Sequence, residues 1–432
     1  MEQWDRGYQV RQSGIYAGAS ALLQLNIGAI LLVGAILRIA WALAIPVVPL
    51  SDSHAYDTFA TNIWQHGVYG WTPESPTSYW PVGTSALYAL IYQIFGHQYA
   101  AIVGLNILFS LGIIFYAYKT TELFFYKSVA AGTALLVAVW PTHIFFVTIL
   151  ASELPYMLLT LMGIFYFFKE EKVSPQNILI IGTCFALAYY VRPLATTVLA
   201  VCAFSAVVAC GKRFTPTIIR TLLVLLIMAL AVSPWAKRNY DLYGHVVPMS
   251  TNGGAVFWMG NTPGTEGGYH PLPEYVKGLN EHERNQTLKK EAVKYIQEEP
   301  LAFLLRTAEK FVAFHSRETI GITWNEEGIK HRFGAGWIMP LKLLSQCFWL
   351  TCLIIGLIGI LIYLRKSPFK HIFHPFLLLW LSSAGLHALI VAQDRYHIPV
   401  VPFIFAFSIY GVHYFAERLR MKRGILAPES QA

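Results

Sequence analysis

Two aspartates that directly follow a strongly apolar segment are the first residues whose type and position could do chemistry. Asp52 and Asp57 come after the apolar residues 26–49, with His54 and Tyr56 between them. A carboxylate at the edge of a membrane can take a proton from an acceptor hydroxyl or amine. Asp57 lies about one helical turn beyond Asp52 and could equally be a solvated or helix-capping carboxylate. Asp52 is therefore the stronger candidate for a reactive group.

Charged residues also follow four later apolar segments, and their types complement the aspartates. They are Glu153, Arg192, Arg238 and Arg395. Burying a charge at a membrane boundary is costly unless the charge is paired or functional, so we expect these groups to line one polar cavity. Guanidinium groups bind phosphate bidentately and stabilise the charge of a leaving group. Carboxylates and arginines together suit glycosyl transfer from a lipid phosphate.

Arg192 and Arg395 stand in short connections that otherwise hold almost no basic residues. Each could be an interfacial anchor that keeps its charged head in water and its stem along apolar surface. Two such residues beside a loop that carries carboxylates favour the binding of an anion instead.

Other chemistry-bearing residues lack the spacing of a known site. His54, His66 and His143 lie near the same expected face, but they have no paired metal-ligand spacing, so we assign them hydrogen-bonding or structural roles. No phosphate-binding loop or dinucleotide fingerprint follows a predicted strand. All five cysteines fall inside apolar runs, which predicts packing roles: Cys184, Cys202, Cys210, Cys347 and Cys352.

The composition is that of a polytopic membrane protein. Hydrophobic residues make up 55% of the chain and charged residues only 13%, with a mean hydropathy of +0.48. Charged residues approach about a quarter in soluble domains. Arg38 lies inside the first apolar segment and must face the protein interior, as a partner for a carboxylate or for backbone carbonyls.

Segments of about 20 apolar residues are long enough to cross the hydrocarbon core. Ten such segments are predicted as spans: 26–49, 99–118, 128–150, 154–168, 175–191, 194–211, 217–236, 338–364, 371–391 and 396–416. The apolar residues 82–96 are too few to make the crossing obvious, and they could form an eleventh span or a helix in the interface.

The distribution of charge decides between these alternatives. Although the chain has a formal net charge of +8, no Lys or Arg occurs between Leu50 and Gln98. If 82–96 does not cross, nearly all basic residues of the short loops fall on the cytoplasmic side, as the positive-inside rule requires. We therefore predict ten spans, both termini in the cytoplasm and the carboxylate-bearing loop outside.

Three regions follow from this topology. Residues 1–236 are predicted to form a transmembrane core with a catalytic first outer loop at 50–98, 237–335 an extracytoplasmic cap, and 336–432 the last spans and a cytoplasmic tail. Within the cap, helical residues interrupted at Pro300 are expected. The helix after that proline has apolar residues at helical spacing and is expected to lie on the bilayer surface.

The order of the motifs resembles that of the GT-C glycosyltransferases, in the group of the protein O-mannosyltransferases and lipid A aminoarabinose transferases. The resemblance covers most of the chain, and Trp80 departs from it where many relatives have a basic or polar residue. The matching motifs are Asp52-x3-Tyr56-x3-Ala60, Pro81-x-Gly83 with Phe95-Gly96, Ser152-Glu153-Leu154-Pro155, Arg192-Pro193, Pro234-Trp235-x2-Arg238-Asn239, Gly260-Asn261 and Arg395-Tyr396-x2-Pro399.

This resemblance implies an all-α GT-C fold with interfacial helices in the first outer loop and a small cap. It implies transfer of a sugar from a polyprenyl phosphate such as undecaprenyl phosphate, with inversion at the anomeric carbon, and it leaves a divalent metal undecided. The implied roles are a base or acceptor-orienting carboxylate for Asp52, a second acid for Glu153, donor binding for Arg192, Arg395, Tyr396 and Arg238, and support for Tyr56, Asp57, His54 and Asn261.

The acceptor stays open between protein, lipid and glycan, and no nucleic acid is expected as a partner. A plasma-membrane enzyme with its site outside is the favoured interpretation. An O-antigen ligase or polymerase would use similar outer arginines. A transporter or flippase would need ionisable groups near the middle of the bilayer, where only Arg38 is expected. A non-catalytic scaffold would leave the clustered charges unexplained.

Overall fold

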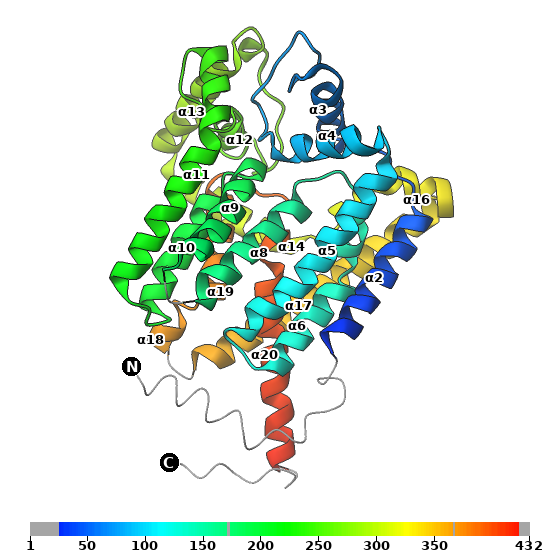
Figure 1. Ribbon diagram of the computed structural model, residues 1–432, viewed down its shortest axis with the longest axis vertical. Helices are drawn as coiled ribbons and strands as arrows, with labels where there is room; N and C mark the ends of the chain where they lie inside the picture. Colours follow the sequence, from blue (N-terminus) through cyan, green and yellow to red (C-terminus); the bar gives the residue numbers. More distant parts are fainter. Residues whose placement is uncertain (1–25, 171–172, 366–367, 423–432) are drawn as a thin grey trace.

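The computed structural model describes residues 26–170, 173–365 and 368–422, and these form a helical protein without a regular strand (Figure 1). The terminal segments 1–25 and 423–432, which carry the prediction of cytoplasmic termini, lie outside the described residues. The elements of the first half are α2 (Ile27–Ala44), α3 (Asp52–His66), α4 (Gly83–Phe95), α5 (Tyr99–Glu122), α6 (Lys127–Val139), α7 (Pro141–Phe145), η3 (Phe146–Thr148), α8 (Glu153–Lys169), α9 (Pro175–Val191), α10 (Ala195–Val208) and α11 (Phe214–Tyr243). Those of the second half are α12 (Gly253–Met259), η4 (Glu274–Val276), α13 (Glu281–Glu298), α14 (Pro300–Ser316), α15 (Ile320–Thr323), α16 (Glu326–Phe333), η5 (Ala335–Trp337), α17 (Ile338–Leu364), α18 (Pro368–His371), α19 (Pro375–Leu389), η6 (Ile398–Val400) and α20 (Val401–Lys422).

Long apolar helices form the lower body of the molecule. By length and composition, five described helices could cross a membrane, namely α2, α5, α11, α17 and α20, and a sixth span results if α6 and the bent segment after it are taken together. Shorter apolar helices, α9, α10 and α19, accompany them. Each of the ten predicted segments thus contains a helix, but the count of ten spans is not confirmed.

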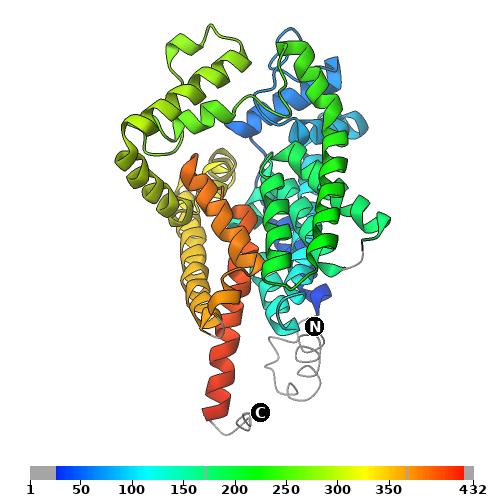
Figure 2. The ribbon, with the colours of Figure 1, turned by 90° about the vertical axis from the view of Figure 1, so that its left-hand side faces the viewer.

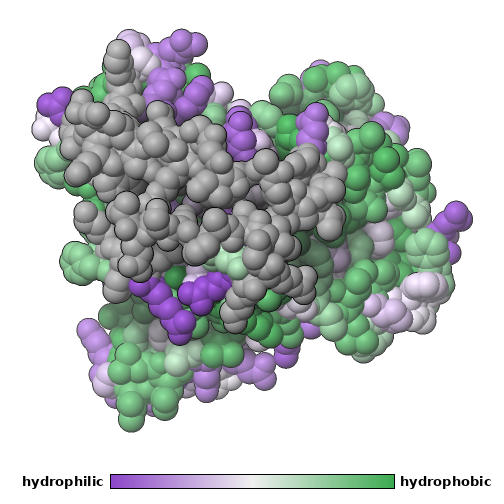
Figure 3. Space-filling view, turned by 90° about the horizontal axis from the view of Figure 1, so that it is seen from below, coloured by the Kyte–Doolittle hydropathy of each residue, from purple (hydrophilic) through white to green (hydrophobic). Residues whose placement is uncertain are grey.

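The outward faces of these helices are apolar, as lipid contact requires. Leu32, Leu230 and Leu361 are among the large hydrophobic side chains that the fold leaves exposed. Seen from the end at which α20 finishes, hydrophobic residues cover most of the visible sides, with hydrophilic residues between them (Figure 3). A chain whose sides are apolar and whose spans are helical is a multi-pass membrane protein.

The predicted first outer loop folds into two short helices that lie side by side at one end of the molecule. Helices α3 and α4 pack against each other there, together with α12 and α13 (Figure 1). The 13 residues of α4 extend about 20 Å, less than the roughly 30 Å of hydrocarbon that a span must cross. α2 begins and α20 ends at the opposite end of the molecule, which agrees with an uncrossed α4.

A cap formed by α12, α13 and α14 covers the upper ends of α17 and α19 (Figure 2). The predicted interruption at Pro300 is confirmed, because this proline opens α14 at a position where its missing N–H is tolerated. The apolar face predicted for this helix is exposed at Leu301, Leu304 and Val312. α11 continues through the predicted boundary at 236 and ends only at Tyr243.

Arg38 is fully buried inside the helical body, as its place in the first apolar segment predicted. Its guanidinium donates to the carbonyl oxygens of Gly34 at 3.0 Å, Ala138 at 2.7 Å and Val137 at 3.1 Å. The ring of His143 lies 2.8 Å from it and is likewise buried. Both residues therefore tie α2 to α6 and the turn after it.

We expect cysteine labelling to place both ends of α4 on one side of the membrane. In a Cys347→Ser background, which removes the exposed native thiol, His54→Cys and Gln93→Cys should react with a membrane-impermeant reagent in intact cells. Lys127→Cys, beyond α5, should react only after permeabilisation. Labelling of Gln93→Cys only after permeabilisation, with His54→Cys labelled from outside, would contradict an uncrossed α4.

Candidate active site

Asp52 is the first residue of α3, and the chain enters that helix through a strained residue. Ser51 has φ of 56° and is the one described non-glycine residue with positive φ. Such a conformation costs about 1–3 kcal/mol and is kept where surrounding structure determines it. The sharp turn lets the chain leave the membrane after α2 and present the Asp52 carboxylate at the start of a helix, where the helix dipole favours a negative charge.

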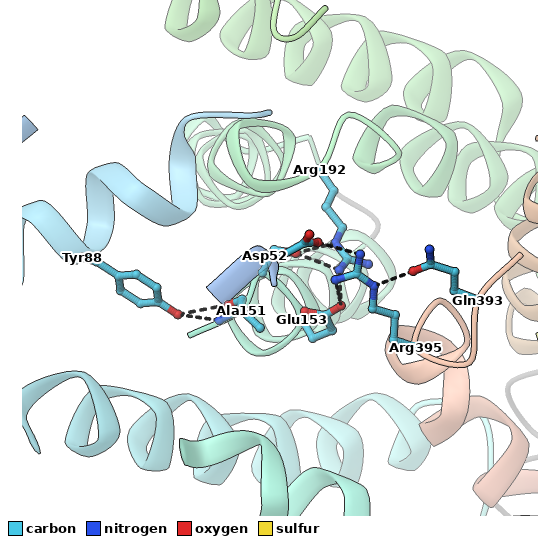
Figure 4. A network of polar contacts seen from close by, with 8 residues as sticks. Asp52, Tyr88, Ala151, Glu153, Arg192, Gln393 and Arg395 are labelled. Atoms are coloured by element: carbon cyan, nitrogen blue, oxygen red, sulfur yellow. Dashed lines mark hydrogen bonds and ion pairs between the residues drawn. The ribbon is translucent and has the colours of Figure 1, made fainter. Parts of the chain in front are cut away.

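Arg395 joins Asp52 to the other end of the chain. Its Nη2 lies 2.7 Å from Oδ2 of Asp52, and its Nη1 lies 3.9 Å from Oε1 of Glu153. Its Nε donates to the side-chain oxygen of Gln393 at 3.1 Å (Figure 4). Among the described residues, Asp52 is bonded through Oδ2 alone, and its side chain is 22% exposed. The second carboxylate oxygen is therefore free to meet a ligand.

Arg192 forms the second ion pair of the same cluster, with Glu153 at the start of α8. Nη2 of Arg192 lies 2.5 Å from Oε1 of Glu153 and 2.7 Å from Oγ of Ser152. Glu153 is fully buried, and its Oε2 has no hydrogen-bond partner among the described residues. The segment before Glu153 is fixed by Tyr88 of α4, whose hydroxyl accepts from the N–H of Ala151 and donates to its carbonyl (Figure 4).

The cluster keeps its charges because each buried arginine has a carboxylate beside it. Burial alone would lower the pKa of Arg395, but Asp52 raises that pKa above its ordinary value, with further contributions from Tyr396 and Glu153. Glu153 similarly raises the pKa of Arg192 against the effect of burial. Burial and the charge of Asp52 raise the pKa of the nearby Tyr56 to about 12, so this phenol stays neutral.

Aromatic rings flank both guanidinium groups. The Cζ atom of Arg395 lies 4.8 Å from the ring centroid of Trp324 and 5.4 Å from that of Tyr396. Tyr396 in turn stacks on His387 of α19, with ring centroids 4.4 Å apart. These contacts limit the movement of the Arg395 guanidinium, whose attraction to ring faces is strongest where water is excluded.

An apolar cavity leads from this cluster into the helical body. Arg192, His387 and Tyr396 line its polar end, and side chains of α8, α10, α19 and α20 line the rest. The apolar lining includes Ile164, Val198, Leu379, Leu386, Val400 and Phe403. The site thus offers arginine at one end and an apolar groove below it, an arrangement that fits a lipid with an anionic headgroup.

Two of the predicted support residues lie apart from this cluster. Asp57 accepts hydrogen bonds from Tyr92 at 2.6 Å and Tyr99 at 2.7 Å, and the ring of His97 lies 2.9 Å from it. This carboxylate ties α3 to α4 and α5. His54 is exposed on α3.

Arg238 is brought to a different place from Arg192 and Arg395. Its guanidinium donates to the carbonyl of Thr77 and to Oγ of Ser78, both at 2.8 Å, and to the carbonyl of Tyr69 at 3.3 Å. These contacts fasten the connection between α3 and α4 to the upper end of α11. The structure therefore gives Arg238 partners in the protein rather than in the cluster around Asp52.

Asn261 also lies outside the cluster, at the junction between the cap and α19. Its Nδ2 donates to the carbonyls of Phe257 at 2.9 Å, Leu389 at 3.0 Å and Ile390 at 3.3 Å, and its Oδ1 accepts from Lys310 at 2.8 Å.

Several residues of the site were not singled out from the sequence. Ser152 and Gln393 stand within two positions of Glu153 and Arg395, and this proximity is the signal that could have found them. Tyr156 and Trp324 contact the arginines through ring faces, and nothing in the spacing of the sequence distinguishes them from packing aromatics.

The carboxylates of the cluster do not form a metal-binding set. Asp52 and Glu153 are each held by an arginine, and no group of three or more His, Cys, Asp or Glu in the described part of the chain is arranged to hold a metal ion. We therefore propose no reaction step that involves a metal ion.

Loss of Glu153 should destabilise the protein. Glu153→Ala leaves the buried Arg192 without its carboxylate, and we expect the free energy of unfolding to fall by about 3 kcal/mol, measured by equilibrium unfolding in mixed micelles. The control, Glu274→Ala, removes a solvent-exposed ion pair with Lys277 and should change stability by less than about 1 kcal/mol. Equal effects of both variants would contradict the buried pair.

Comparisons with known proteins agree with this fold. Residues 80–236 match the family model described as dolichyl-phosphate-mannose-protein mannosyltransferase, which includes Glu153 and Arg192 but not Asp52 or Arg395. No curated protein sequence matches the chain.

Two solved structures are among those similar to this chain. The apo oligosaccharyltransferase of Archaeoglobus fulgidus is 13% identical with a TM-score of 0.56, over 94% of this chain and 53% of that one, so this chain spans about half the length of that enzyme. ArnT from Cupriavidus metallidurans, crystallised with undecaprenyl phosphate, is 11% identical with a TM-score of 0.45, over 94% of this chain and 82% of that one. Together with the motifs, the oligosaccharyltransferase match shows that the chain has the GT-C fold of membrane glycosyltransferases.

Proposed function

We propose that this protein is a membrane glycosyltransferase that moves a sugar from a polyprenyl-phosphate donor to an acceptor on the extracytoplasmic face. The observation that carries the proposal is an ion-paired cluster whose Arg192 lines one end of an apolar groove. An amphipathic donor with an anionic head matches both parts of that site. An acceptor of protein, lipid or glycan can approach the exposed side of Asp52.

The donor phosphate binds at Arg192 and Arg395 in this proposal, with Tyr396 beside it. Arg192 lines the polar end of the groove, and Arg395 lies beside it, since both approach Oε1 of Glu153. Bidentate bonds to phosphate are among the strongest that arginine makes. The polyprenyl chain follows the apolar residues between α8, α10, α19 and α20. Charge that develops on the leaving phosphate is then stabilised where it forms.

Asp52 acts as the general base. Its unbonded oxygen takes the proton of the acceptor hydroxyl or amine while the acceptor atom attacks the anomeric carbon and the bond from that carbon to the phosphate oxygen breaks. The electron pair of that bond leaves with the polyprenyl phosphate, which the arginines hold. Direct displacement of this kind inverts the anomeric centre.

Glu153 and Arg238 support the reaction from different distances. Glu153 orients Arg192 with one carboxylate oxygen, and its other oxygen is buried without a partner among the described residues. Arg238 shapes the loop after α3 through its bonds to backbone carbonyls. We therefore reassign Arg238 from donor binding to the positioning of that loop.

The role of Asp52 as general base can be tested against a matched control, Asp57, on the same helix. Asp52→Asn should lower the turnover number about 1,000-fold, because a general base contributes about a hundred- to ten-thousand-fold. Asp57→Asn makes the same chemical change five residues later, in a carboxylate that bonds tyrosines and His97, and should keep turnover within about tenfold. Transfer from polyprenyl-phosphate sugars to envelope acceptors is measured with purified enzyme.

Turnover of Asp52→Asn close to that of the unsubstituted enzyme would overturn the assignment of the base. The donor and acceptor needed for this assay are found by comparing glycolipids and glycoproteins of a deletion strain with its parent by mass spectrometry. The glycoform that is missing from the deletion strain identifies the product.

The groove can be tested by filling it. Ser383→Trp places a large ring in the groove lining of α19 and should raise KM for a long-chain donor about tenfold, a loss of about 1.4 kcal/mol, with little effect on a donor of two isoprene units. Leu381→Trp, at an exposed position of the same helix, is the control and should leave KM unchanged for both donors. An equal effect of Ser383→Trp on both donors would argue against the groove as the site of the chain.

A further inference from the structure

Lys310 of α14 is a buried cation whose hydrogen bonds in the described structure go to neutral oxygens. It is 1% exposed, and no ion pair joins it to a described carboxylate. Its Nζ donates to Oδ1 of Asn261 at 2.8 Å and lies 3.3 Å from the carbonyl of Leu389 and 3.4 Å from that of Ile390. Burial lowers its pKa to about 8, so it stays largely protonated at neutral pH.

The two carbonyls belong to the C-terminal end of α19. The last carbonyls of a helix lack partners within it and carry the negative end of the helix dipole. Lys310 and Asn261 satisfy these oxygens from the cap, so the helix is ended by a cation and an amide that come from two other segments.

The cap approaches this helix end more closely than ordinary side chains would allow. A Cβ atom on Gly260 would lie 1.9 Å from the carbonyl oxygen of Ile390, and one on Gly267 would lie 2.5 Å from Cγ of Lys310. Gly267, which has φ of +84°, also accepts a hydrogen bond from the N–H of Ala392 at 3.0 Å. The loop of residues 260–268 thus packs directly against the residues that follow α19.

That chain leads within three residues to Arg395. After Ala392, Gln393 accepts the hydrogen bond of Arg395 Nε. Asp394 accepts from the N–H of Thr319 at 3.4 Å and from its hydroxyl at 3.1 Å. Arg395 then forms its ion pair with Asp52. A displacement at the end of α19 would move the guanidinium that faces the donor.

We infer that Lys310 is a positioning residue of the donor site, which with Asn261 fixes the end of α19 and thereby the guanidinium of Arg395. This inference rests on the proposed function for its kinetic consequence. Lys310 itself does not touch the donor, and its effect passes through backbone carbonyls.

The first test is hydrogen exchange of the unliganded protein in nanodiscs, which requires no substrate. In Lys310→Met, amide exchange in a peptide covering residues 389–397 should become about tenfold faster, because the carbonyls of α19 lose their cationic donor. Exchange in α8 should be unchanged. Lys290→Met, at an exposed position on α13, is the control, and Lys310→Arg should restore most of the protection.

Gly267→Ala perturbs the same contact from the loop, since its Cβ atom would press on the Lys310 side chain. It should accelerate exchange in the same peptide although Lys310 is intact. This second variant decides the matter if Lys310→Met does not fold.

The kinetic test compares the two substrates of the reaction. Lys310→Met should raise KM for the donor about tenfold, leave KM for the acceptor within about twofold, and be rescued by Lys310→Arg. Unchanged exchange in the peptide, or faster exchange with an unchanged KM for the donor, would overturn the inference. If the unsubstituted enzyme transfers no sugar from any polyprenyl phosphate, the proposed function fails, while the exchange measurements still decide whether Lys310 holds this segment.

Discussion

The paired charges of Asp52 with Arg395 and of Glu153 with Arg192 are the interaction on which the rest of the site depends. Each pair is kept as a pair, because removing one partner would leave the other charge without its compensation, at a cost in free energy. The 3.9 Å approach of Arg395 to Glu153 joins both pairs into one cluster whose formal charges cancel. In the proposed reaction, a donor phosphate that binds the arginines would weaken their ion pairs with the carboxylates. Donor binding would then free Asp52 to act as a base when the donor is present.

The helical body positions this cluster and orients its side chains. Ser51 turns the chain so that α3 begins at Asp52, and Tyr88 fixes the segment that leads to Glu153. The groove below receives side chains from four helices and is apolar along most of its length. In the proposed function, an anion without a long chain would leave the groove empty, whereas a lipid phosphate would occupy both parts. Specificity for an isoprenoid carrier would then come from shape and apolar contact rather than from additional polar groups.

The sequence was sufficient to predict the helical body and to single out the charged residues that form the cluster, because hydropathy and the positive-inside rule restrict where a charge can occur. It could not predict the pairing of Arg395 with Asp52, whose positions are separated by 343 residues. The resemblance assigned Arg238 to donor binding and Asn261 to support of the site, yet both donate to backbone carbonyls outside the cluster. Lys310 gave no signal, since a lysine in an amphipathic helix is ordinarily solvated.

The cap is fastened to both halves of the site by buried polar groups. Glu281 of α13 accepts hydrogen bonds from the N–H of Ser78 at 2.9 Å and from the hydroxyl of Tyr243 at 2.7 Å, beside the loop that follows α3. Lys310 of α14 holds the end of α19 on the donor side. Apolar contacts alone would let the cap slide over these surfaces, because dispersion has little directional preference. Hydrogen bonds to single backbone atoms fix the position of the cap on these surfaces. They thereby fix the loop after α3, on the proposed acceptor side, relative to Arg395 on the proposed donor side.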